Sequence, residues 1–106
     1  MKEAYNSLKK NPANYIPLTP ISFLSRTADI YGEREAIIYG NRRYTWNQCK
    51  ERCLRMASSL SNKGIGEGDT VAVLAFNTPE MFEVHFSIPM TGAVLNTINT
   101  RLDFET

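Results

Sequence analysis

The feature that most constrains the fold of this chain is a strand, helix and strand pattern in its second half. Residues 70–76, TVAVLAF, form an apolar run of strand length, and residues 93–98 are predicted to form a second buried strand. Between them, Thr78 suits a helix N-cap, Pro79 suits the first helical position and Pro89 should end or bend the helix. Strands that are apolar throughout are typical of parallel sheets covered on both faces. The pattern therefore predicts an α/β fold with one right-handed parallel βαβ unit.

A first helix is predicted upstream, over residues 20–31. Thr19 can cap it, and Pro20 fits its first position, where the missing N–H costs nothing. Apolar side chains then recur at spacings of three and four, at Ile21, Leu24, Ala28 and Tyr31. Gly32 suits the left-handed residue that often follows the end of a helix.

A short hairpin and the longest helix come next. Residues 36–39 form a short apolar run, a turn follows, and residues 43–46 resume the pattern, which predicts a hairpin. Thr45 and Gln48 then have the spacing of a capping box, in which each side chain bonds to the backbone of the other residue. The predicted helix covers residues 46–63. Its buried side is expected to carry Trp46, Cys49, Cys53, Met56 or Ala57, and Leu60.

Composition and charge argue against some partners. The 106 residues carry 12 basic and 11 acidic side chains, and a net charge of +1 creates no strong field for nucleic acid. No stretch reaches the roughly eighteen apolar residues that a membrane span requires. Residues 1–18 contain two prolines and little periodicity, which predicts an irregular arm without a secretory signal. We therefore expect a soluble, cytoplasmic chain with no nucleic-acid partner and no membrane span.

The two cysteines, Cys49 and Cys53, lie four residues apart in the predicted long helix. Their Cβ atoms then point the same way, which is poor geometry for a disulfide. The one histidine, His85, is about thirty residues away and has no Cys or His companion. We expect two reduced thiols in an intracellular core and no metal site.

Gly64, Gly66 and Gly68 are candidates for a phosphate-binding loop, but their place in the chain argues against it. Phosphate loops connect a strand to the following helix, so that the helix N-terminus faces the phosphate. These glycines connect a helix to the following strand. We expect a helix C-cap followed by a tight turn.

Four charged or titratable residues remain as candidates. His85 lies on an apolar helix and is expected to be partly buried and hydrogen-bonded, while Glu80 and Glu83 should form a solvated face. Arg101 follows a buried strand at the carboxyl edge of the predicted sheet, where α/β proteins tend to bind ligands. It could meet a carboxylate or phosphate, or tie to backbone carbonyls or an acidic neighbour, and both roles stay open. No catalytic, cofactor-binding or metal-binding residue is predicted.

A series of short motifs runs through the chain from about residue 12. They are NYIPLTPISFL (14–24), YTW (44–46), GI (64–65), GDTVA (68–72), NTPEM (77–81), HF (85–86), PM (89–90), GAV (92–94) and NTRL (99–102). Their order and spacing resemble those of plant-type acyl-activating enzymes. These are AMP-forming acyl-CoA ligases of the adenylate-forming superfamily, related to benzoate- and cinnamate-CoA ligases.

The resemblance implies a reaction in two steps. A carboxylate attacks ATP to give an acyl-adenylate and pyrophosphate, and the thiol of coenzyme A then displaces AMP. ATP, Mg²⁺ and coenzyme A are thus implied for a full-length relative. The family's Ser/Thr/Gly-rich phosphate loop and its C-terminal-domain lysine match no segment here, so no catalytic residue carries over.

The resemblance also implies that residues 19–106 are part of the family's large N-terminal domain, after an arm at residues 1–18. Asp103 has the position of a helix N-cap, yet the chain stops at Thr106, which predicts a truncated domain. We expect a ligase fragment that is inactive alone and is completed by the remainder of the domain. The full-length relative could be peroxisomal.

Two alternatives stay open. The chain could be a non-catalytic protein-interaction module, which exposed apolar surface on a stable monomer or dimer would favour. It could instead be a small independent nucleotide-binding βαβ protein, which ATP binding by the isolated chain would favour.

Overall fold

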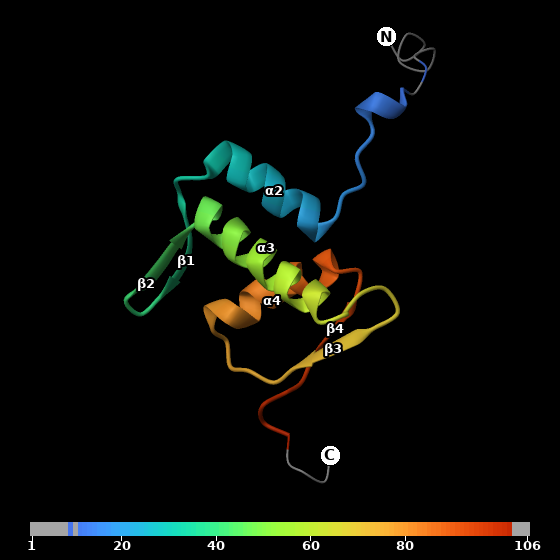
Figure 1. Cartoon of the computed structure of the whole chain (residues 1–106). Helices are drawn as coiled ribbons and strands as arrows, with labels where there is room; N and C mark the ends of the chain where they lie inside the picture. The colour runs from blue at the N-terminus through green and yellow to red at the C-terminus, as the bar shows by residue number, and fades with distance from the viewer. Residues whose placement is uncertain (1–8, 10, 103–106) are drawn as a thin grey trace.

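A computed structural model describes residues 9 and 11–102 of the chain (Figure 1). The elements in chain order are the 3-10 turn η1 (Pro12–Asn14), α2 (Pro20–Tyr31), β1 (Glu35–Tyr39), β2 (Arg42–Thr45), α3 (Trp46–Asn62), β3 (Thr70–Val73), α4 (Pro79–Met90) and β4 (Val94–Thr97). Strands β1 and β2 form an antiparallel hairpin, and β3 and β4 pair in parallel on either side of α4 in the sequence. The predicted α/β fold, with its hairpin and its βαβ unit, is confirmed. The predicted cap at Asp103 lies outside the described residues.

The helices begin where the capping residues predict. Thr19 and Ser22 form a reciprocal capping box at the start of α2, and Thr45 and Gln48 form another at the start of α3. In both cases the hydroxyl accepts a backbone N–H three residues on, which satisfies a donor that the helix itself leaves free. Thr78 caps α4 in the same way, without the return bond.

Gly32 follows α2 but does not have the predicted left-handed conformation. Its φ is −52° and its ψ is −35°, which any residue can adopt. A Cβ at this position would lie 2.4 Å from the side-chain nitrogen of Asn47 and 2.5 Å from the carbonyl oxygen of Ala28. Glycine is therefore required here by close packing. Gly64, which follows α3, does have a positive φ of 86°.

The three helices share a core in which α3 is central (Figure 1). On its α2 side, Cys49 and Cys53 are buried against Leu24, with the partly buried Trp46 and Phe86 packed around them. Toward the strands, a second cluster contains Leu60, Val84, Ile88 and Ala93. Of the two alternatives on α3, Ala57 is buried and Met56 is exposed.

Both cysteines are free and buried, as predicted. The Cys53 thiol donates to the backbone carbonyl of Glu83 over 3.7 Å. Its interaction with Cys49 and its burial raise the pKa of the Cys53 thiol, so this thiol stays protonated at neutral pH.

The strand β3 is shorter than the predicted run and covered on one face. It pairs with β4 only from Thr70 to Val73, and Leu74 has left the ladder. Val71 and Val73 pack on the cluster beneath α3 and α4. By alternation, the opposite face presents Ala72 and Thr70, with Val94 of β4 beside Thr70, and the exposed Leu74 follows beyond the end of the ladder. We call this the outer face. Among the described residues nothing covers it, so the predicted cover on both faces is found on one.

Candidate functional site

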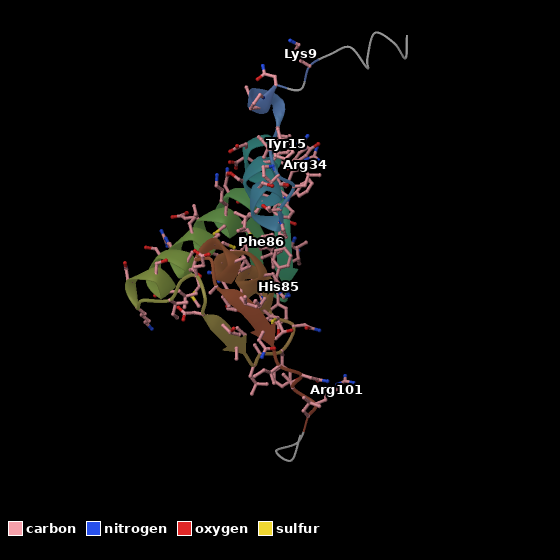
Figure 2. All side chains as sticks on the ribbon, turned by 90° about the vertical axis from the view of Figure 1, so that its right-hand side faces the viewer. Lys9, Tyr15, Arg34, His85, Phe86 and Arg101 are labelled. Carbon is pink, nitrogen blue, oxygen red and sulfur yellow. The ribbon has the colours of Figure 1, made fainter. Side chains whose placement is uncertain are left out.

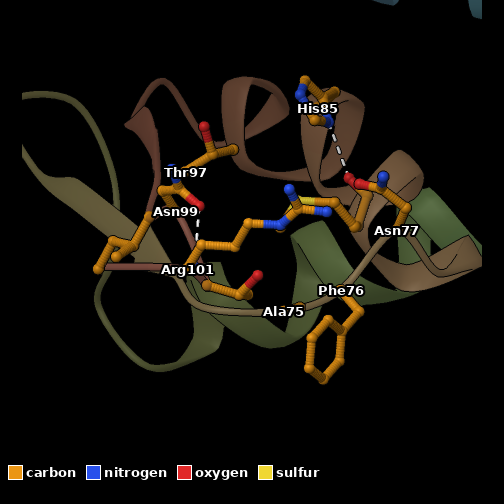
Figure 3. Close-up of a pocket in the computed structure, with 10 residues that line it drawn as sticks. Ala75, Phe76, Asn77, His85, Thr97, Asn99 and Arg101 are labelled. Carbon is orange, nitrogen blue, oxygen red and sulfur yellow. Dashed lines mark hydrogen bonds between the residues drawn. The ribbon is translucent and has the colours of Figure 1, made fainter. Parts of the chain in front are cut away.

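The carboxyl ends of β3 and β4 lie at the same edge because the two strands are parallel. The chain segments that leave these ends, together with the adjacent side of α4, enclose a hollow of about 750 Å³ (Figure 3). Its walls are Ala75, Phe76, Asn77, Met81, His85, Thr97, Ile98, Asn99, Thr100 and Arg101. The hollow lies where ligands of α/β proteins are generally bound.

Among the described residues on these walls, Arg101 is the one with a permanently cationic side chain. The side-chain oxygen of Asn99 accepts the backbone N–H of Arg101 over 2.9 Å, which turns the loop back on itself. Figure 3 shows the Arg101 side chain reaching from the end of β4 across the hollow toward Asn77. Since none of the described residues on its walls is a carboxylate, the chemistry of these walls suits a carboxylate or phosphate group. The sequence predicted this placement of Arg101 but not that Asn77 and His85 would line the same hollow.

His85 is exposed, which corrects the prediction that it is partly buried. Its Nδ1 lies 2.7 Å from the carbonyl oxygen of Met81, one turn earlier in α4. A carbonyl only accepts, so Nδ1 carries the hydrogen, and Nε2 is an acceptor when the ring is neutral. Figure 2 shows His85 and Phe86 on the side of the molecule that faces the viewer. The predicted hydrogen bond of His85 is confirmed.

Glu83 is buried, with 6% of its surface exposed, which corrects the prediction of a solvated face. Arg52 of α3 donates from Nε to Glu83 Oε1 over 2.7 Å. This contact and the charge of Glu83 raise the pKa of Arg52. The same guanidinium stacks 4.3 Å from the centre of the Tyr44 ring. This pair was not predicted from the sequence, because 31 residues separate its members.

Glu80 is half-exposed and pairs with the hairpin. Arg42 of β2 donates to Glu80 Oε1 over 2.6 Å and to the Tyr44 hydroxyl over 2.9 Å. Hydrogen bonding from Arg42, with the backbone N–H at the start of α4, lowers the pKa of Glu80 to about 2. Arg52 also approaches Glu80 at 3.7 Å. These residues, with Glu83, connect the hairpin, α3 and the first turns of α4.

Residues 64–69 form a turn that is closed by hydrogen bonds between its own residues. The carboxylate of Asp69 accepts the backbone N–H of Gly66 over 2.8 Å, and the Asp69 N–H donates to the Gly66 carbonyl. The segment follows α3 and leads into β3, as predicted.

In the part of the chain that the structure describes, no three His, Cys, Asp or Glu side chains gather as metal ligands would. Nor does any described helix have the length and apolar character needed to cross a bilayer.

The chain belongs to the AMP-binding enzyme family, whose pattern matches residues 24–106. It is 55% identical over 100 residues to the Arabidopsis thaliana protein named "Probable acyl-activating enzyme 8". It is also 54% identical over 98 residues to the peroxisomal trans-cinnamate:CoA ligase of Petunia hybrida. The resemblance to plant acyl-activating enzymes is therefore confirmed.

The matched part covers nearly all of this chain and a small part of its relatives. It amounts to 93% of the chain and 18% of the Arabidopsis protein, and to 92% and 17% for the petunia ligase. Among solved structures, the O-succinylbenzoate coenzyme A synthetase of Bacillus subtilis, in complex with ATP and magnesium ion, has a TM-score of 0.69 and 31% identity. That match covers 76% of this chain and 22% of the synthetase. The α/β arrangement described above is thus that of the corresponding part of an acyl-CoA synthetase.

Proposed function

We propose that this chain forms the opening part of the AMP-binding domain of an acyl-CoA ligase and acts there as scaffold, together with one wall of a ligand hollow. One observation carries the proposal: nearly the whole chain matches a stretch that makes up only 18% of an acyl-activating enzyme. The reaction would join a carboxylic acid to coenzyme A with conversion of ATP to AMP and pyrophosphate. Residues 19–106 are the proposed domain portion, after the arm at residues 1–18.

The structure supports a scaffold role for most of the chain. The core between α3 and α4 contains the apolar residues Leu60, Val84 and Ile88, and the partly buried ion pair of Arg52 and Glu83 lies beside it; none of these lines the hollow. Among the described residues on the walls of the hollow, Arg101 and His85 are the only titratable side chains. We assign no catalytic residue to the chain, and expect it to be inactive in isolation.

The described residues fit some of the implied cofactors better than others. The acid, ATP and coenzyme A all carry anionic groups, and the Arg101 guanidinium suits such a group. Mg²⁺ prefers clustered carboxylate and phosphate oxygens, and none of the described residues on the walls of the hollow is a carboxylate. We therefore place the metal site of the full-length ligase outside these residues.

A replacement experiment tests the proposal. The matching residues of the petunia trans-cinnamate:CoA ligase are exchanged for this chain, and the chimera is assayed for cinnamoyl-CoA formation and for ATP–pyrophosphate exchange. We expect activity in the chimera, none in the isolated chain and none in a ligase that lacks the segment. An inactive, folded chimera would contradict the proposal. Exchange activity or ATP binding in the isolated chain would instead support an independent nucleotide-binding protein.

The outer face favours a second candidate, a protein-interaction module. Val94 is exposed beside Thr70, and Leu74 is exposed just beyond the other end of the strand pair. Among the described residues, β3 and β4 each have one strand edge without a partner, and such surfaces tend to bind other chains. A stable monomer or dimer of the chain, measured by sedimentation velocity, would favour this alternative. Aggregation that stops when the remainder of the ligase is supplied would favour the scaffold role.

The location of the protein is also a proposal. The petunia relative is named peroxisomal, which supports a peroxisomal location for a full-length ligase that contains this chain. For the chain expressed alone we propose the cytoplasm. Fluorescent fusions of both forms, imaged with a peroxisomal marker, would test the two locations.

A further inference from the structure

We propose that Arg52 is a positioning residue of the ligase reaction. Through Glu83 and Glu80 it fixes the first turns of α4, the helix that contributes Met81 and His85 to the hollow. The inference rests on the proposed function, because it concerns the same hollow. Arg52 itself does not line the hollow, so its role is exerted through α4.

One side of α4 lines the hollow, and another side carries the two glutamates that pair with Arg52. Met81 and His85 are four residues apart and share the side that lines the hollow. Glu80 and Glu83 are three residues apart and share the side that meets Arg52. A rotation of α4 that displaced the two glutamates would therefore move the wall of the hollow by the same angle.

The geometry of Arg52 allows little freedom. Its Nε lies 2.7 Å from Glu83 Oε1 and its Nη2 lies 3.7 Å from Glu80 Oε1, so one planar group contacts both carboxylates. The plane also stacks on Tyr44 of the hairpin, with 4.3 Å to the ring centre. The Glu83 side chain is only 8% exposed. A buried carboxylate that loses its cation must turn toward water, and its helix must move with it.

A second arginine limits the damage that loss of Arg52 would cause. Arg42 still holds Glu80 at 2.6 Å, and the apolar contacts of Ile88 and Val84 with Leu60 are untouched. We therefore expect a variant at position 52 to fold with α4 displaced at its N-terminal end. The segment that follows β3 is displaced too, since Asn77 immediately precedes the cap of α4.

The experiment uses the chimeric petunia ligase with Arg52→Met, Arg52→Lys and the matched control Arg55→Met. Arg55 lies on the same helix but forms an exposed pair with Glu51. A displaced wall weakens binding that substrate and transition state share, which raises KM and leaves kcat unchanged. For Arg52→Met we therefore expect a rise of about tenfold in the KM of at least one of acid, ATP and coenzyme A. We expect kcat to stay within about twofold, Arg52→Lys to recover part of the loss and Arg55→Met to match the parent.

A variant that is destabilised elsewhere shows whether a change in KM comes from misplaced binding groups or from a general loss of stability. Leu60→Ala weakens the contact of α3 with α4 without touching either glutamate, and we expect it to lower Tm with unchanged KM values. Hydrogen–deuterium exchange of residues 77–86 should accelerate in Arg52→Met and stay as in the parent in Arg55→Met. Unchanged KM values and exchange in Arg52→Met would overturn the inference, as would equal KM shifts in Leu60→Ala. An inactive parent chimera would contradict the proposed function, while the exchange measurement would still decide the role of Arg52.

Discussion

The α3–α4 interface and the outer face of the β3–β4 pair contain similar apolar residues in opposite surroundings. At the interface, Ile88 is completely buried against Leu60 and Val84. On the outer face, Leu74 is 66% exposed and Val94 is 61% exposed. Both regions involve the βαβ unit, one through α4 and the other through β3 and β4. The described residues therefore cover one side of the strand pair and leave its other side open.

This difference shows which parts of the fold depend on nearby sequence. The interface forms from helices that are close in the chain and whose apolar side chains recur at helical spacing. A strand that is apolar on both faces needs a second layer, which no described residue provides. The contrast agrees with the proposal that the rest of an acyl-CoA ligase supplies that layer.

Truncation of Ile88 should have the largest effect on stability. Ile88→Ala leaves a cavity at the centre of the interface, and we expect a loss of about 2–5 kcal/mol in the free energy of unfolding. Urea unfolding can be followed through the single tryptophan, Trp46, at the start of α3. Val94→Ala is the matched control on the outer face, with an expected change below about 0.5 kcal/mol. Equal losses in the two variants would show that the outer face is covered after all.

The next largest effect is expected at Gly32. Gly32→Ala would gain helix propensity, but its new Cβ would lie 2.5 Å from the backbone oxygen of Ala28, which cannot move without distorting α2. We expect a net loss of about 1–3 kcal/mol, as for other overpacked sites. Gly66→Ala is the control, because the nearest atom would be 3.7 Å away, and it should be neutral or slightly stabilising. A stabilised Gly32→Ala variant would mean that this turn relaxes freely.

Gly32 also illustrates how far the sequence could predict the fold. The helix starts at Thr19, Thr45 and Thr78 were predictable because a cap depends on residues within one turn. The requirement for glycine at position 32 arises from close contact with the carbonyl oxygen of Ala28 and with the side chain of Asn47, which is fifteen residues away. The local rule, which expected a left-handed conformation, therefore gave the wrong reason. The end of β3 at Val73 was likewise set by its pairing with β4.

The candidate site was predictable only in its location. The order of strand, helix and strand places Arg101 at the carboxyl edge of the sheet by topology alone. The exposure of His85 and the burial of Glu83 depend on how α4 is rotated against α3. The sequence predicted a partly buried His85 and a solvated Glu83, and the structure has the reverse. Nothing near Glu83 in the sequence pointed to Arg52.

A smaller effect is expected from the exposed pair of Glu80 and Arg42. The pKa of Glu80 is lowered to about 2 in the folded chain, against about 4.3 in an unfolded one. Its stabilising contribution is therefore complete above about pH 4.3 and is lost as the pH falls through about 2. Because the Glu80 side chain is 53% exposed, solvent and salt weaken the contribution. We expect the free energies of unfolding of Glu80→Gln and the parent to differ slightly at pH 7 and to converge as the pH falls. A difference that grew as the pH fell would contradict the expected direction of this pH dependence.

The smallest effect on the isolated chain is expected at Leu74, and it gives the sharpest test of the comparison. Leu74→Ser removes exposed apolar surface, so the free energy of unfolding should change by less than about 0.5 kcal/mol while self-association, measured by sedimentation velocity, decreases. Leu54→Ser on α3, where the leucine is also half-exposed, is the control for general surface polarity. In the chimeric ligase Leu74→Ser should instead be destabilising. The polar side chain at position 74 would then be buried under the second layer, which lowers Tm. A chimera that tolerates Leu74→Ser as well as Leu54→Ser would mean that the outer face stays open in the full-length enzyme.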